Sequence, residues 1–80
     1  MNEKQAILDD IFTYHSPNED DILKYKNLRE KAKEFATLII DICPACPDRS
    51  SALRKVRESL MTANASIALE GKDFHLLTKR

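Results

Sequence analysis

The chain has 80 residues, which is enough for one domain and close to the lower limit for a core that folds unaided. It carries 13 basic and 13 acidic side chains, so no net charge draws it to nucleic acid or to a membrane surface. One glycine, three prolines and an abundance of helix-forming residues predict an all-helical protein.

The first ten residues, MNEKQAILDD, hold acidic side chains where a signal peptide needs a basic and then an apolar segment. No apolar run approaches the ~18 residues of a membrane span. We therefore expect a soluble, intracellular protein.

The first predicted helix covers about residues 3–13 and is too short to persist alone. Its apolar face consists of Ala6, Ile7, Ile11 and Phe12. The segment SPNE that follows is typical of a capping box, with Ser16 as the N-cap, Pro17 at the first helical position and Glu19 reaching back to the cap.

Two long helices are predicted next, because apolar residues recur at alternating spacings of three and four. The first runs from Pro17 to about Cys43 and is roughly 40 Å long at ~1.5 Å per residue. The second starts near Asp48 and ends before Gly71, a natural C′ residue. The two seams contain Tyr25, Leu28, Ala32, Phe35, Ile39 and Ile42, and Leu53, Val56, Leu60, Ala63 and Ile67.

The seams match in period and nearly in length, so the helices should pack as an antiparallel hairpin across the bend at Pro44 and Pro47. Each helix then buries a single stripe, and the short first helix cannot cover the rest. The apolar residues left over are Ile22, Leu38, Ile40, Met61 and Leu69. We therefore expect an oligomer whose core includes helices from several copies.

We assign residues 1–71 to one helical hairpin domain and residues 72–80 to a C-terminal tail without clear periodicity. The tail is either disordered or lies across a partner through Phe74, Leu76 and Leu77.

The two cysteines form the motif Cys43-Pro-Ala-Cys46. A single CxxC is compatible with half a zinc site or with a redox pair. Zinc wants four ligands, and His15 and His75 are distant in sequence, while a thioredoxin-like motif needs strands. The favoured interpretation is two small residues that fill the corner, with zinc bridging two copies as the remaining alternative.

The residues indicate binding rather than catalysis. The sequence shows no nucleophile with a base, no carboxylate pair and no glycine-rich phosphate loop, since Gly71 is the only glycine. We expect no enzyme activity, no cofactor and no metal.

Basic residues are nevertheless zoned on both long helices. On the first, Lys26 and Arg29 share a face and Lys33 lies one turn further along. They either form a solvated face with nearby acidic partners or, with Tyr14 and His15 at the same end, a nucleotide site. Flat side chains stack on bases and cations pair with phosphates. The other members of the zone are Lys24, Lys31, Arg49, Arg54, Lys55 and Arg57.

Two of these interpretations have plain structural alternatives. Tyr14 is either a base-stacking residue or a half-buried corner aromatic with its hydroxyl in water. Asn64 stands in an apolar context, in a stripe with Arg57, Met61 and Ala68, and needs a partner there. That partner is either a neighbouring helix or the edge of a ligand.

Two segments resemble a known family. IFTYHSPNEDDILKYKNLREKAKEFA and CPDRSSALRKVRESLMTANASIALEG are similar to the small helical phage proteins that sequester cyclic oligonucleotides, the anti-CBASS sponges. Their hairpin domain also occurs in sponges against the Thoeris system. The resemblance covers about Ile7 to Gly71, and its most specific features are F-x-Y-H-x-P and A-N-A-x-I-A. The β-rich domain of the Thoeris type is absent, so the compact anti-CBASS type fits better.

The resemblance implies a hexamer of interlocked hairpins in the cytoplasm of an infected bacterial host. It implies pockets between protomers for cyclic dinucleotides of the cyclic GMP–AMP type, and separate pockets for cyclic trinucleotides such as cyclic triadenylate. For dinucleotides it points to Tyr14 and His15 at the corner and to Arg29 or Lys26 for a phosphate. For trinucleotides it points to Arg57, Thr62 and Asn64. No membrane or DNA partner is implied.

Two alternatives remain at this point. One is a helical adaptor or inhibitor that binds a host protein through its exposed seam. The other is an RNA-binding protein that uses the basic face, for which affinity should fall steeply with salt.

Overall fold

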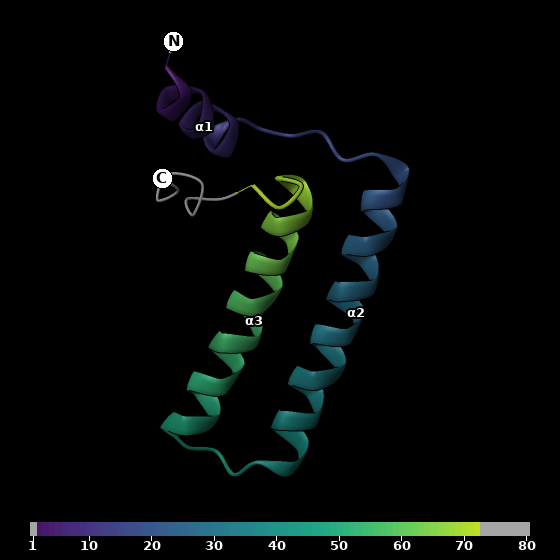
Figure 1. Ribbon diagram of the computed structural model, residues 1–80. Coiled ribbons are helices and arrows are strands. Elements are labelled where there is room, and N and C mark those ends of the chain that lie inside the picture. The colour runs from purple at the N-terminus through teal and green to yellow at the C-terminus, as the bar shows by residue number, and fades with distance from the viewer. Residues whose placement is uncertain (1, 73–80) are drawn as a thin grey trace.

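The computed structural model describes residues 2–72 and contains three helices and no strand in that range. They are α1 (Glu3–Phe12), α2 (Glu19–Ile42) and α3 (Pro47–Ala68). Figure 1 shows α2 and α3 side by side and antiparallel, with α1 beside the open end of the hairpin. The all-α hairpin that the sequence predicts is confirmed. Among the described residues, no helix has the length and apolar character needed to cross a membrane.

The helix α1 is capped at both ends by local hydrogen bonds. Asn2 is its N-cap and accepts a hydrogen bond from the backbone N–H of Gln5 at 2.8 Å. The helix ends at Phe12, because Thr13 is already extended (φ −92°, ψ 142°). Its length therefore agrees with the prediction to within one residue.

The start of α2 differs from the predicted capping box. The N-cap is Asn18, which accepts a hydrogen bond from the N–H of Asp21 at 2.7 Å, and Asp21 accepts one from the N–H of Asn18 at 3.4 Å. Ser16 and Pro17 lie in the connector instead. A cap at position 18 places three consecutive acidic residues in the first turn, where the positive end of the helix dipole stabilises them.

The bend between α2 and α3 is held by Arg49. Its Nη1 donates to the backbone carbonyls of Cys43 at 3.3 Å and Ile40 at 3.5 Å, which lie at the end of α2. Pro47 occupies the first position of α3, where its missing N–H costs nothing. The N-cap, Cys46, makes no side-chain cap hydrogen bond.

The end of α3 is a Schellman motif, and its C′ residue is Glu70 rather than the predicted Gly71. The N–H of Gly71 donates to the carbonyl of Ser66 at 3.0 Å, and that of Glu70 donates to the carbonyl of Ile67 at 3.1 Å. Glu70 adopts a left-handed conformation (φ 53°), followed by Gly71 (φ 81°). The glycine therefore extends the left-handed turn by one residue instead of starting it.

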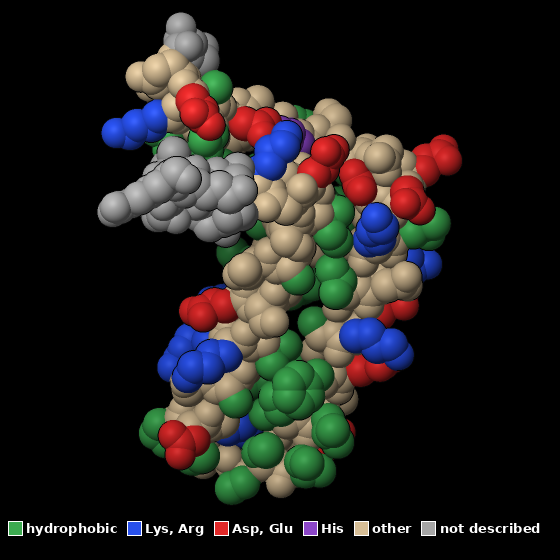
Figure 2. Space-filling model, in the orientation of Figure 1, with side chains coloured by type: hydrophobic (Ala, Val, Ile, Leu, Met, Phe, Trp, Pro, Cys, Tyr) green, Lys and Arg blue, Asp and Glu red, His purple; other side chains and the backbone are tan. Residues whose placement is uncertain are grey.

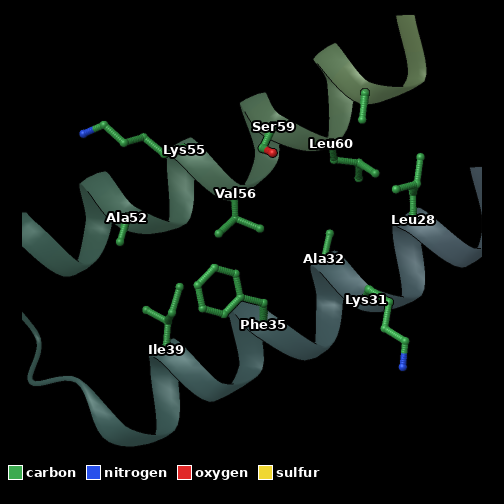
Figure 3. Close-up of a pocket in the computed structure, with 11 residues that line it drawn as sticks. Leu28, Lys31, Ala32, Phe35, Ile39, Ala52, Lys55, Val56, Ser59 and Leu60 are labelled. Carbon is green, nitrogen blue, oxygen red and sulfur yellow. The ribbon is translucent and has the colours of Figure 1, made fainter. Parts of the chain in front are cut away.

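The seam between α2 and α3 is only partly closed. Ile39 is the one buried hydrophobic residue in the described range, at 7% exposure. Phe35, Ile39 and Val56 point toward one another between the helices (Figure 3), yet Phe35 remains 56% exposed. The predicted seam residue Ile42 is 71% exposed. The middle of the predicted seam lines the groove between the helices, but Ile42, Leu53 and Ile67 do not. A pair of helices cannot cover residues at the edge and end of the seam.

Hydrophobic side chains consequently remain on the surface along the seam and around the bend (Figure 2). Between the helices runs an apolar groove of about 520 Å³. In the described residues, α1 does not pack along α2 or α3, so it leaves this groove open. The predictions for Phe74, Leu76, Leu77 and His75 fall outside the described residues.

Candidate functional site

The connector between α1 and α2 is organised by hydrogen bonds to the end of α1. The last four carbonyls of a helix lack intrahelical partners. The Thr13 hydroxyl donates to the carbonyl of Asp9, and Nε2 of His15 donates to the carbonyl of Asp10 at 2.7 Å. The imidazole that the sequence placed at a corner thus caps the helix before it, and its ring orientation is fixed.

An ion pair closes the same corner from the other end of the chain. Nζ of Lys72 lies 2.9 Å from Oδ2 of Asp10, and Nε2 of His15 lies 3.7 Å from Oδ1 of the same carboxylate. The hydrogen bond to Asp10 raises the pKa of the Lys72 ammonium. One carboxylate therefore joins α1, the connector and the segment that follows α3.

These contacts leave Tyr14 projecting from the connector. Its side chain is 81% exposed. The alternative that Tyr14 is a half-buried corner aromatic is therefore wrong for the single chain. An exposed aromatic ring on a fixed backbone presents both faces for stacking.

Beside Tyr14 lies a hollow of about 510 Å³ at the open end of the hairpin. Both tyrosines of the chain line it, Tyr14 from the connector and Tyr25 from α2. Residues from all three helices and the connector complete the wall: Ile11, Thr13, His15, Pro17, Met61, Asn64, Ala65, Ala68 and Leu69. The hollow is thus mostly apolar, and its lining combines two flat rings with small residues of α3.

Among the sequence-predicted dinucleotide residues, the structure brings Tyr14 and His15 into this hollow but not Lys26 or Arg29. Arg29 follows the lining residue Tyr25 by four positions and lies one turn along the same side of α2. Lys26 lies about 100° round the helix from Tyr25. Both cations are exposed.

Ion pairs separate the basic residues of α2 into two groups. Lys24 pairs with Asp20 at 3.6 Å and Lys31 with Glu34 at 3.2 Å, as expected of a solvated helix face. Lys26 and Arg29 have no acidic partner within 4 Å among residues 2–72. The two cations that the resemblance selects are therefore available to an external anion.

The three predicted trinucleotide residues are not brought together within one chain. Asn64 lines the hollow beside Tyr14. Arg57 precedes the lining residue Met61 by four positions, one turn toward the bend. Thr62 lies two positions before Asn64, nearly opposite it on α3, and does not line the hollow.

Asn64 also carries the one unsatisfied buried side-chain atom found in the described residues. Its Oδ1 is shielded from solvent and has no hydrogen-bond partner there. The sequence predicts that this amide needs a partner, and within residues 2–72 of a single chain its Oδ1 has none.

The sequence did not point to Tyr25 or to Asp10 as parts of this site. The spacing of apolar residues places Tyr25 in the seam, although its position near the start of α2 indicates that it lies at the open end. The contact of Asp10 with Lys72 joins residues 62 positions apart, and no local pattern announces it.

The cysteines lie at the opposite end of the hairpin. Both thiols are free, with Cys43 half-buried and Cys46 exposed. Within the described range, no group of three or more His, Cys, Asp or Glu side chains is placed to hold a metal ion. Neither cysteine lines the hollow.

Fold and site together define a small helical-hairpin protein with an open hollow lined by two tyrosines. A family model described as "Acb2/Tad1, hairpin domain" matches residues 4–68. The chain therefore belongs to this family, the sponges that counter the CBASS and Thoeris defences. Comparisons with curated proteins and with solved structures found no match. The family resemblance inferred from the two sequence segments is confirmed, and membership indicates a non-catalytic sponge for cyclic oligonucleotides.

Proposed function

We propose that this chain is a non-catalytic phage sponge that binds cyclic di- and trinucleotide second messengers and thereby blocks CBASS signalling in its bacterial host. The observation that carries the proposal is the exposed ring of Tyr14 at the edge of the hollow. Stacking of a base on an aromatic ring contributes about 1–3 kcal/mol to binding. The ring of Tyr14 can make this contact without first losing packing within the chain.

The phosphates of the ligand would lie toward the cations of α2. Arg29 is the better candidate because it is one turn from Tyr25 on the same side of the helix, whereas Lys26 points elsewhere. A guanidinium also pairs with a phosphate in a bidentate manner. His15 lines the hollow, and its hydrogen bond to Asp10 holds the connector on which Tyr14 stands.

The trinucleotide site requires more than one copy of the chain. Thr62 and Asn64 lie on nearly opposite sides of α3, so one ligand can contact both residue types only if they come from different protomers. The predicted hexamer would supply such positions, with Arg57, Thr62 and Asn64 contributed by different copies.

Sequestration needs affinity and abundance but no chemistry. A sponge lowers the free concentration of the messenger below the level that the host effector requires. The mostly apolar lining of the hollow is consistent with this role, since none of its residues is acidic.

A second function, a helical adaptor that binds a host protein, is favoured by the apolar groove between α2 and α3. Such grooves accept amphipathic helices. This alternative predicts affinity for a protein partner and none for cyclic nucleotides, so the same titrations distinguish the two.

The test uses Tyr14→Ala and Arg29→Glu, titrated with a cyclic dinucleotide by calorimetry. Each should weaken binding by about ten-fold or more, because one loses the stacking ring and the other replaces a cation with a repulsive anion. Arg54→Glu is the matched control, since Arg54 is exposed on α3 and does not line the hollow. Light scattering should show an unchanged oligomer. Unchanged affinity in both site variants would refute the assignment of the pocket.

A further inference from the structure

The side chain of Asn64 is held in an unfavourable position within the described chain. Its Oδ1 is removed from water and accepts no hydrogen bond there. An acceptor in that state has lost its bonds to water without replacement, whereas an apolar side chain of similar shape would lose nothing. Folding alone therefore gives no reason for an amide at this position.

Two other polar side chains of the hollow have local roles. Thr13 and His15 line the same hollow, but both donate to carbonyls at the end of α1. Asn64 is the only carboxamide among the lining residues. Asn64 lines this hollow together with Tyr14 and the small residue Ala68, and its volume of about 510 Å³ leaves room for a flat ring.

A carboxamide offers one acceptor and one donor side by side. Adenine presents the complementary pair at its N6 amino group and N7, and asparagine is well suited to bind both at once. Guanine presents O6 and N7 at the same edge, which are both acceptors, so one of them would face Oδ1.

We propose that Asn64 determines the base specificity of this site by pairing with an adenine that stacks on Tyr14. Rotation of the carboxamide about its last side-chain torsion brings Oδ1 to the hollow, where it accepts a hydrogen bond from N6 while Nδ2 donates one to N7. This inference rests on the proposed function and refines it, because it names the base that the hollow holds.

The experiment titrates cyclic di-AMP and cyclic di-GMP into the full chain by calorimetry. The wild type should bind cyclic di-AMP about ten-fold tighter, as a bidentate base contact provides. Asn64→Leu keeps the approximate shape of the side chain and removes both polar atoms. It should weaken cyclic di-AMP binding about ten-fold and abolish the preference.

Two further variants complete the design. Asn64→Asp should also weaken cyclic di-AMP binding about ten-fold, because a carboxylate has no N–H for N7 and repels that acceptor. It decides the question if Asn64→Leu does not fold. Asn27→Leu removes an exposed asparagine of α2 outside the hollow and should bind both ligands as the wild type does.

Three outcomes would overturn the inference. A preference for cyclic di-AMP that survives in Asn64→Leu would show that other groups read the base. A change of molar mass in light scattering of Asn64→Leu would assign Asn64 to a contact between helices of different copies. Equal binding of both ligands by the wild type would overturn the inference alone, whereas binding of neither would overturn the proposed function with it.

Discussion

Arg49 shows how a single residue can be assigned to the wrong role from sequence. It lies near the start of α3 among other basic residues, and the sequence pattern places it with them in a basic zone. In the structure its guanidinium reaches back to the carbonyls of Ile40 and Cys43 at the end of α2. A cation at that end also interacts favourably with the helix dipole. Arg49 therefore stabilises the bend and is not free to bind a ligand.

Replacement of Arg49 by alanine should lower the free energy of unfolding by about 1 kcal/mol, the usual contribution of such hydrogen bonds. Arg54→Ala is the control on the same helix. Arg54 is exposed and forms no ion pair among residues 2–72, so its loss should change stability by less than about 0.5 kcal/mol. Urea denaturation at matched protein concentration measures both. Equal effects of the two substitutions would contradict the role of Arg49.

At the scale of the element, the start of α2 depends on which residue caps it. The sequence offers Ser16 and Asn18, two good N-cap residues only two positions apart. The structure selects Asn18, whose side chain and backbone exchange hydrogen bonds with Asp21. The choice determines how many residues remain in the connector that carries Tyr14 and His15.

Asn18→Ala should therefore destabilise the protein by about 1 kcal/mol through loss of the cap. Ser16→Ala, two residues away, should have little effect, because Ser16 lies outside the helix. Thermal unfolding of the two variants at one concentration provides the comparison. The opposite order of stability would restore the capping box predicted from sequence.

The elements themselves could be predicted from the sequence, but their ends and the site only in part. The regular spacing of apolar residues and the prolines at positions 44 and 47 define two paired helices. Caps depend on single hydrogen bonds, so Ser16 and Asn18 look equivalent until the backbone is known. Tyr14 was recognised by its residue type alone. Tyr14 and Asn64 line the same hollow because of the path of the connector and the register of the hairpin, and sequence spacing determines neither.

At the scale of the whole molecule, the single chain exposes more surface than a compact protein of its size. Its accessible surface is 6604 Å², against about 4,900 Å² expected for a compact chain of 9.2 kDa. Its radius of gyration is 16.5 Å, against about 12 Å for a compact domain of 80 residues. The excess surface of roughly 1,700 Å² is about twice the area that one partner buries in a stable protein interface, about 800 Å².

We therefore predict that the purified chain is an oligomer at low micromolar concentration, with a hexamer expected from the family resemblance. Its unfolding temperature should rise with protein concentration, since association stabilises the folded chain by mass action. Light scattering coupled to size exclusion measures the molar mass.

Phe35→Glu would place a charge in the apolar groove and should dissociate the oligomer. Thr37→Glu introduces the same side chain at an exposed position of α2 outside the groove and should leave the molar mass unchanged. A wild-type chain that is monomeric and stably folded would contradict the prediction.

The central claim is that the protein binds cyclic oligonucleotides and does not degrade them. The most direct test is calorimetric titration of the purified wild-type protein with cyclic GMP–AMP and with cyclic triadenylate, followed by chromatography of the ligand released after denaturation. We predict tight binding, a stoichiometry that reveals how many protomers share each pocket, and intact ligand on recovery. Absence of heat with both ligands, or recovery of linear products, would contradict the account.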